Sequence, residues 1–325
     1  MPQVMIHAPA KLNLHLNIGD RRPDGFHEIE SLFLALAFGD TLSLETIPSG
    51  DTEIILDWQL PWGSPEDLSP EKNIVNQAIF LFRKRTGFDK NLKIVLEKRI
   101  PLGGGLGGGS SDAAAALLAL NRLASADGKG LVNNAVLTEM GASLGSDVPF
   151  FLQIARNDGY SIAWVSGRGE IVRPFAVPPQ VQSLSLVLIN PGFPSDTAKA
   201  FRLLDEYRES GVKRSAEKQS PHVCPQFLSE TPRNWPFTND FLPIFETIFQ
   251  QKKTNNEAIS TYREIFSALE QMGSDFFGLS GSGSTCFGVF SSQNRAKTAR
   301  DLLLKRWKFV VETFYLRSEQ YGDTI

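Results

Sequence analysis

Residues 101–120 read PLGGGLGGGSSDAAAALLAL, a glycine cluster that runs directly into a stretch of helix formers. The alternating segment LKIVLE at residues 92–97 precedes it and predicts a strand. From about Ser110 to Ala124 the composition predicts a helix. Glycines allow positive φ, so that successive N–H groups can converge on anionic oxygens, and a helix start adds unpaired N–H groups. The stretch therefore predicts a phosphate cradle that needs no basic side chain.

Other interpretations of this glycine cluster fit the sequence less well. A flexible linker is seldom bracketed by a strand and an alanine-rich helix. Gly103, Gly105 and Gly108 match the spacing of the dinucleotide-binding fingerprint, but Pro101 would then occupy its tight first turn. The P-loop pattern fails, because Ser110 stands where its lysine should be.

Three polar residues follow the glycines. A carboxylate beside bound phosphates is repulsive, so we expect Asp112 to cap the helix and to compensate its dipole instead. Ser110 and Ser111 are candidates for capping the helix and for donating to phosphate or to a magnesium shell.

Length and composition limit the function classes. The 325 residues suggest about two domains. A formal net charge of -3 argues against a general basic field that holds nucleic acid. Cys224 and Cys286 are too few for a disulfide framework, and the four histidines show no metal-ligand spacing, which leaves any metal ligands unknown. Neither a signal peptide nor an apolar run of about 20 residues is apparent, which predicts no membrane span and a reduced setting, cytoplasmic or inside an organelle, of which we expect the cytoplasm.

Outward from the glycine cluster, the chain mixes strands and helices. Residues 10–18 alternate, which predicts a strand with one buried face and with Lys11 and Asn13 on the polar face. Residues 21–25 predict a turn. Residues 205–237 are polar and predict a mobile or irregular excursion. Further helices are predicted at 73–85, 134–144, 241–250 and 258–272, and further strands at 161–165, 184–189, 286–290 and 309–314.

Two charged residues are candidates for chemistry. Asp147 lies between a helix-ending glycine and Pro149, where it is either an ordinary N-cap or a group that orients an attacking hydroxyl. Lys11, taken alone, reads as a solvated lysine on the polar face of a strand.

Four segments together resemble the GHMP kinases, in the order expected of that family. They are HAPAKLNLHLNIGDRRPDGFHEIESLF at 7–33, PLGGGLGGGSSDAAAAL at 101–117, LGSDVPFF at 144–151 and LSGSGSTCFGVF at 279–290. The first segment is the most specific, because its DGFHEI core resembles the branch of the family that acts on cytidine diphosphate-linked methylerythritol.

The resemblance implies a two-domain α+β fold with the active site in a cleft between the halves. A ribosomal-protein-S5-like ATP-binding domain is expected at 1–160, and a ferredoxin-like substrate domain at 161–325. Asp147 matches the family's base and Lys11 its partner cation. The triphosphate loop is matched by Pro101, Leu102, Gly103, Gly104, Gly105, Leu106, Gly107, Gly108, Gly109, Ser110 and Ser111.

For the substrate, the resemblance assigns Phe26 to stacking on the cytosine ring and His27 to hydrogen bonding with it. Thr197 and Phe201 match the opposite wall of that pocket, and Asn13 is expected to reach the substrate. The family usually has tyrosine where this chain has Phe26, so the stacking face is kept and a hydroxyl is lost.

The resemblance thus implies a kinase that uses ATP with Mg²⁺ to phosphorylate the 2-hydroxyl of the cytidine-linked polyol, in isoprenoid precursor synthesis. A kinase of the same family for mevalonate, homoserine or a sugar is the first alternative, and a non-catalytic nucleotide sensor is the second. Residues 280–284, SGSGS, match a third family motif, for which close chain packing and a role near the phosphate loop are equally open.

Overall fold

The structure of the chain, a computed structural model, describes residues 3–69, 73–128, 130–156, 160–209, 224–252 and 257–317. Its strands are β1 (Gln3–Arg21), β2 (His27–Ile47), β3 (Glu53–Trp58), β4 (Asn91–Lys98), β5 (Ile162–Gly167), β6 (Ile171–Phe175), β7 (Ser185–Asn190), β8 (Phe276–Leu279), β9 (Cys286–Phe290) and β10 (Phe309–Thr313). Its helices are α1 (Ile74–Thr86), α2 (Gly108–Ala126), α3 (Asn134–Leu144), α4 (Val148–Ile154), α5 (Pro179–Gln182), α6 (Thr197–Glu209), α7 (Cys224–Phe227), α8 (Phe241–Lys252), α9 (Glu257–Gln271), α10 (Gln293–Leu303) and the 3₁₀ turns η1 (Pro65–Asp67) and η2 (Pro232–Asn234).

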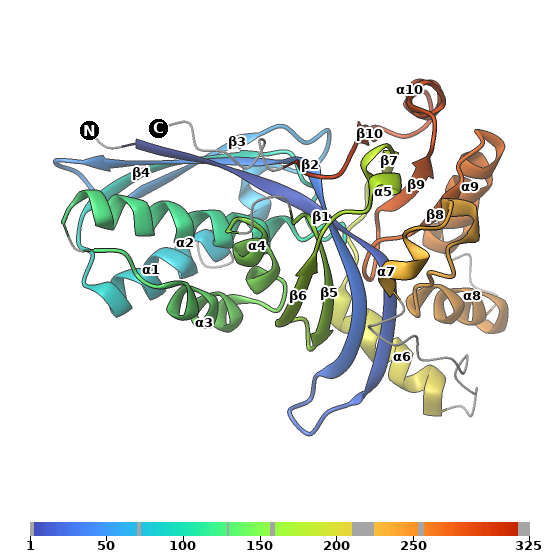
Figure 1. Cartoon of the computed structure of the whole chain (residues 1–325), viewed down its shortest axis with the longest axis horizontal. Helices are drawn as coiled ribbons and strands as arrows, with labels where there is room; N and C mark the ends of the chain where they lie inside the picture. The colour runs from blue at the N-terminus through green and yellow to red at the C-terminus, as the bar shows by residue number, and fades with distance from the viewer. Residues whose placement is uncertain are drawn as a thin grey trace.

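The strands form two sheets. The first has the order β3-β4-β2-β5-β6, with β1 paired to β2, and the second has the order β10-β7-β9-β8. Only β3 and β4 pair in parallel; the other described pairs are antiparallel. Figure 1 shows α1, α2 and α3 against the first sheet, and α8, α9 and α10 at the other end of the molecule with the second. The predicted α+β class is confirmed.

The first sheet continues past residue 160, where the sequence suggested that the second domain begins. Strands β5 and β6 pair with each other, and β5 pairs with residues 29–34 of β2. Residues 162–175 are therefore part of the first sheet. The domain boundary itself stays a prediction.

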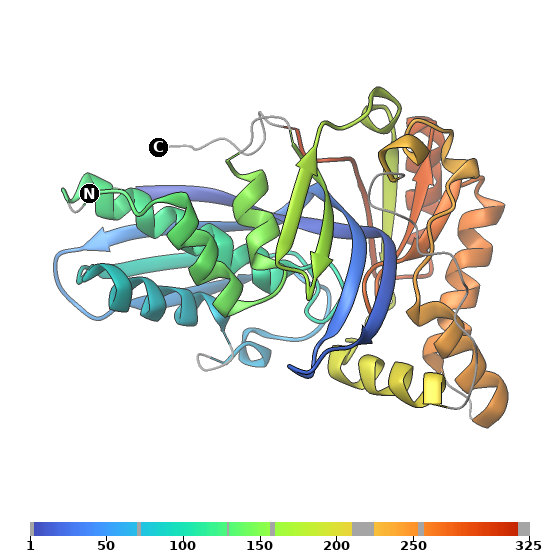
Figure 2. The same ribbon diagram turned by 60° about the horizontal axis from the view of Figure 1, so that its bottom comes forward.

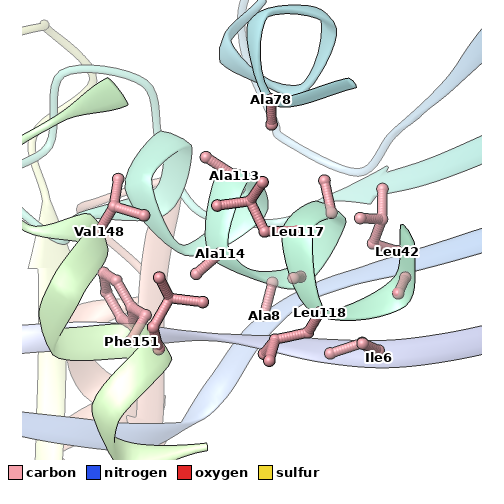
Figure 3. Packing of buried hydrophobic residues seen from close by; sticks show 14 of the residues in the cluster. Ile6, Ala8, Leu42, Ala78, Ala113, Ala114, Leu117, Leu118, Val148 and Phe151 are labelled. Carbon is pink, nitrogen blue, oxygen red and sulfur yellow. The ribbon is translucent and has the colours of Figure 1, made fainter. Parts of the chain in front are cut away.

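Apolar side chains gather in layers between these elements. One cluster lies between the first sheet and helices α1 to α4, a second between the facing sides of the two sheets, and a third between the second sheet and helices α9 and α10. Burial of apolar area on this scale is the main favourable term in folding. Figure 3 shows Ala113 and Ala114 of α2 inside the first cluster, which also contains Val148 of α4 and Ala8 of β1. Alanines allow this close approach of helix and sheet.

Strand β1 is buried on both faces, which corrects the prediction of a strand with one buried face. Ile6 and Ala8 belong to the cluster under the helices, whereas Leu12 belongs to the cluster between the sheets. The register with β2 is irregular between Pro9 and Lys11. Beyond this irregularity Leu12 faces the second sheet, and Lys11 is covered by Phe33 and Phe151 on the helix side of the fold. After a second register shift, between Asn13 and His15, the His15 ring packs against Trp164 and Phe237 between the sheets.

The prediction of a mobile or irregular excursion at 205–237 is wrong for 205–209 and 224–227, which are helical, whereas 228–237 are irregular apart from η2. Residues 205–209 complete helix α6, and residues 224–227 form α7. Trp235 and Phe237 are buried between the two sheets, at 6% exposure each. Residues 210–223 lie outside the described residues. The prediction failed there because the surrounding residues are polar, so that neither the helix nor the two buried aromatic residues gave an apolar pattern.

Helix α6 covers the bend of the β1–β2 hairpin, and Figure 2 shows it beside that end of the hairpin. Its Ala200 and Leu204 pack with Leu16, Ile18 and other apolar residues of the hairpin and α8. Among the described residues, no helix combines the length and the apolarity needed to cross a bilayer.

Candidate active site

The glycine loop has a backbone that requires glycine at several positions. Gly103, Gly105 and Gly107 have φ of 61°, 74° and 70°, in the left-handed region that other residues rarely adopt. Helix α2 begins at Gly108 with Gly107 as its N-cap, two residues before the predicted start at Ser110. The helix has no side-chain cap, so the expected capping by Ser110, Ser111 or Asp112 is wrong.

The loop is tied to the rest of the chain through its carbonyl groups. Four successive carbonyl oxygens accept hydrogen bonds: Gly103 from Ser195 N at 2.8 Å, Gly104 from Thr285 N at 3.1 Å, Gly105 from Ser280 Oγ at 2.8 Å and Leu106 from Lys11 N at 2.9 Å. The C=O and N–H of one planar peptide unit point in opposite directions. The N–H groups of the same peptide units belong to residues 104–107, and in the described part of the chain none of them donates to another backbone group. These amides therefore face away from the carbonyl partners.

Residues 280–284, the SGSGS segment, support the glycine loop from behind. A Cβ at Gly105 would lie 2.1 Å from Ser280 O and 2.8 Å from Gly283 O, so the two loops touch backbone to backbone. The amide of Asn239 donates to Leu279 O and Gly281 O at 2.8 Å each, which fixes the segment in turn. These contacts are the ones expected if the segment serves close packing of the chain.

Asp147 lies next to Lys11. It occupies the N-cap position of α4, but its side chain makes no capping hydrogen bond. Its Oδ2 is instead 3.3 Å from Lys11 Nζ, and the two side chains are 27% and 6% exposed. The carboxylate is therefore the accessible member of the pair, whereas the lysine is almost fully enclosed rather than solvated.

Several groups hold the Lys11 ammonium in place. Its Nζ donates to Asn13 Oδ1 at 2.6 Å and lies 4.4 Å from the centre of the Phe33 ring, a favourable cation–π contact. The glycine loop is close by, since a Cβ at Gly107 would lie 3.0 Å from both Lys11 Cγ and Phe151 Cζ. The lysine, the carboxylate and the glycine loop thus meet in one place.

Ser110 links the start of α2 to the turn before Asp147. Its Oγ would lie 3.6 Å from a Cβ at Gly145. Ser111 Oγ is buried and has no hydrogen-bond partner among the described residues. Within those residues, no group of three or more His, Cys, Asp and Glu side chains is arranged to hold a metal ion.

A buried ion cluster lies beneath the start of α2, and sequence reasoning missed it. Lys98 Nζ donates to Asp112 Oδ2 at 2.8 Å and to Asp40 Oδ2, and all three side chains are at most 3% exposed. Asp112 is thus an ion-pair partner of Lys98 rather than a cap. Burial raises the pKa of the Asp112 carboxyl, and the two carboxylates raise the pKa of Lys98 against its own burial. Asp40 Oδ1 also accepts from Ile100 N at 2.8 Å, just before the glycine loop.

The residues expected at the base pocket lie around the end of the β1–β2 hairpin. His27 stacks on Phe201 with ring centres 4.9 Å apart and an angle of 19°, and its Nε2 is 2.7 Å from Asp205 Oδ1. Thr197 Oγ1 is 2.9 Å from Ser282 Oγ, which joins the start of α6 to the SGSGS segment. Sequence reasoning missed Asp205, although it lies four residues after Phe201 and so on the same helix face.

Phe26 is exposed at the tip of the hairpin. It is 48% exposed, so the ring is open to solvent. The guanidinium of Arg168 lies 5.1 Å from its ring centre, and Arg168 also donates to Ala142 O at 3.2 Å. The arginine comes from the turn between β5 and β6, and no feature of the sequence pointed to it.

Two known protein families match parts of this chain. Residues 73–153 match the family described as the GHMP kinases N terminal domain, and residues 245–308 match the GHMP kinases C terminal family. The 4-diphosphocytidyl-2-C-methyl-D-erythritol kinase of Treponema pallidum (strain Nichols) is 33% identical over 96% of this chain and 98% of its own length. The kinase of the same name from Anaeromyxobacter sp. (strain Fw109-5) is 36% identical over 90% of this chain and 84% of its own.

The chain belongs to the 4-diphosphocytidyl-2-C-methyl-D-erythritol kinase family of GHMP kinases. The resemblance noted in the sequence is thereby confirmed. A solved structure of 4-(cytidine 5'-diphospho)-2C-methyl-D-erythritol kinase superposes with a TM-score of 0.69 and 30% identity, covering 96% of this chain and 99% of that one. The homoserine kinase of Cytophaga hutchinsonii, at 17% identity and a TM-score of 0.65 over 100% and 97% of the two chains, shares the fold.

As a GHMP kinase, the chain is an ATP-dependent small-molecule kinase, and the expected two-domain α+β fold of the family is confirmed. The alternative of a non-catalytic nucleotide sensor is not supported, because the relatives that match over most of the chain are named as kinases.

Proposed function

We propose that the chain transfers the γ-phosphate of ATP to the 2-hydroxyl of 4-diphosphocytidyl-2-C-methyl-D-erythritol, in isoprenoid precursor synthesis by the non-mevalonate route. The names of the relatives, which match over nearly the full chain, support this substrate. The observation that carries the chemistry is the 3.3 Å approach of Lys11 Nζ to Asp147 Oδ2 beside the glycine loop.

The glycine loop is the proposed site of the ATP phosphates, from Pro101 to Ser111. Its carbonyls are bonded to the protein behind it, so its N–H groups are left for anionic oxygens. The first N–H groups of α2 and the positive end of the helix dipole add to this site. The cradle thus explains how a chain of net charge -3 binds a triphosphate.

Mg²⁺ is proposed to arrive with the nucleotide. A magnesium ion bound to the β- and γ-phosphates neutralises their charge and usually keeps several waters. The buried hydroxyl of Ser111, which has no partner among the described residues, fits a role toward such a shell or the phosphates.

Asp147 and Lys11 are proposed to act on the acceptor hydroxyl. The carboxylate is accessible enough to accept a hydrogen bond from the substrate, and the enclosed ammonium lies beside it. In a loose phosphoryl-transfer transition state the proton leaves late, so a weak base that mainly orients the hydroxyl suffices.

The cytidine is proposed to bind at the hairpin tip. Phe26 presents an exposed ring for stacking, and the Arg168 cation beside it suits the negative charge of a diphosphate. His27 and Phe201 are proposed as the polar contact and the opposite wall, with Thr197 at the start of α6. Asn13 is buried against Lys11 and Ser31, so its proposed reach to the substrate is through its second N–H.

A turnover assay separates this substrate from those of other GHMP kinases. Release of ADP is followed with the cytidine-linked polyol, mevalonate and homoserine at equal concentrations. Because only the first carries a base to stack on Phe26, we expect its kcat/KM to exceed the others by at least about 100-fold, the scale of ~1–3 kcal/mol per stacked base plus lost polar contacts. Preferred turnover of mevalonate or homoserine would overturn the proposal.

A cytoplasmic location stays a prediction.

A further inference from the structure

Asn13 is part of a buried chain of hydrogen bonds that starts at Lys11. Lys11 Nζ donates to Asn13 Oδ1 at 2.6 Å, Asn13 Nδ2 donates to Ser31 Oγ at 2.9 Å, and Ser31 Oγ donates to the backbone oxygen of His15 at 2.5 Å. Ser31 is 0% exposed, and Lys11, Asn13 and His15 are each 4% exposed. No water competes for these groups at such burial, so each bond is costly to lose.

The direction of this chain is fixed from its far end. The His15 carbonyl can only accept, so the single proton of the Ser31 hydroxyl must point at it. The hydroxyl is then left with acceptor capacity alone toward Asn13. The Asn13 amide must therefore turn its NH₂ group to Ser31 and its oxygen to Lys11. Turned the other way, the amide would present N–H groups to an ammonium.

A β-bulge supplies the carbonyl that orders the chain. The register of β1 and β2 shifts between Asn13 and His15, so β1 carries one residue more than β2 there. Such a bulge interrupts the ladder and leaves backbone groups without strand partners. Ser31 bonds the carbonyl of His15 at this point.

We propose that Ser31 is a positioning residue of the kinase reaction: it holds the Asn13 amide in the orientation that fixes the Lys11 ammonium beside Asp147. An ammonium has three protons. Asn13 Oδ1 accepts from one of them, and Asp147 Oδ2 lies 3.3 Å from the same nitrogen as its ion-pair partner. Ser31 touches neither substrate nor nucleotide in this role and acts through Asn13. The catalytic part of this inference rests on the proposed function.

A double-mutant cycle in turnover tests the proposal. Ser31→Ala is expected to lower kcat about tenfold, because a buried hydrogen bond of about 1.4 kcal/mol corresponds to a factor of ten. The KM for ATP should stay within about twofold, because Ser31 does not contact the glycine loop. In an Asn13→Ala background the same substitution should change kcat less than about twofold, since its target is gone. Ser31→Thr keeps the hydroxyl and should recover part of the rate.

Ser161→Ala is the matched control. Ser161 is also buried, directly before β5 of the first sheet, and its hydroxyl also donates to a backbone carbonyl, that of Leu316, outside the Lys11 chain. We expect a similar loss of thermal stability and a kcat within about twofold of the wild type. An equal fall in kcat for Ser31→Ala in both backgrounds, or no fall at all, would overturn the proposal.

A measurement without substrate separates this inference from the proposed function. In protein labelled with ¹⁵N-asparagine, the side-chain NH₂ signal of Asn13, assigned by its loss in Asn13→Asp, should exchange slowly in the wild type and in Ser161→Ala. In Ser31→Ala it should shift and exchange faster. An unchanged signal refutes the amide-orienting role, whereas a changed signal together with a wild type that does not turn over the cytidine-linked polyol refutes only the substrate.

Discussion

Gly105→Ala tests how tightly the glycine loop is held. The new Cβ would lie 2.1 Å from Ser280 O at a φ of +74°. A left-handed L-residue costs about 1–2 kcal/mol, and forcing atoms into a filled space costs about 1–3 kcal/mol. Together they strain the closed arrangement of the two loops by about 2–5 kcal/mol. Because the strain is relieved by displacing the loop, we expect ATP to bind at least about 30-fold more weakly, at 1.4 kcal/mol per tenfold.

Isothermal titration measures the loss of ATP affinity, and thermal unfolding measures the loss of stability. Gly128→Ala is the control, because Gly128 follows the other end of α2 at a φ of +80° with no atom within 4 Å of its Cβ position. It should lose stability from the backbone penalty alone and bind ATP normally. Normal ATP affinity in Gly105→Ala would refute the idea that this backbone contact shapes the phosphate cradle.

Three other predictions concern separate parts of the molecule. Phe26→Ala should weaken binding of the cytidine substrate by about 1–3 kcal/mol and leave the ATP affinity unchanged. Phe80 is 70% exposed on α1, so Phe80→Ala should change neither affinity. Equal substrate affinity in Phe26→Ala and the wild type would rule out the stacking role. Lys98→Met leaves the carboxylates of the buried cluster without their cation and should lower the free energy of unfolding by about 3–5 kcal/mol in urea titrations; a loss below about 1 kcal/mol would contradict the ion pairing. Burial lowers the pKa of His15 from 6.5 to about 4, so as the pH falls the unfolded chain binds this proton before the folded chain does. The free energy of unfolding should therefore be fully present above pH 6.5 and fall by about 3 kcal/mol as the pH drops to about 4. His15→Gln should reduce this loss, and the same pH slope in both proteins would contradict the prediction.

Local patterns predicted most of the regular structure. The helix at 134–144 and the strand at 286–290 have the predicted bounds, and the helix predicted at 73–85 runs from 74 to 86. These segments have clear apolar periods and capping or turn residues at their ends. Helix α6 was not predicted, because Asp205 and the polar residues after it gave no apolar period.

The site was predicted where a residue belongs to a motif and missed where long-range contacts decide its role. Asp112 has the chemistry of a helix cap. It is a buried ion-pair partner because the fold places Lys98 of β4 and Asp40 of β2 next to it. Ser31 and Arg168 have no local signal either. Their roles depend on a register shift in β1 and on a turn more than a hundred residues away from Phe26.

The central claim is that Asp147 acts on the acceptor hydroxyl beside Lys11, while the glycine loop holds the phosphates. Measuring kcat and ATP affinity together in Asp147→Asn tests it most directly. The account predicts that kcat with the cytidine-linked polyol falls about 10²- to 10⁴-fold, the scale of general acid–base and orienting groups, while the dissociation constant of ATP stays within about twofold. Turnover close to that of the wild type would contradict it.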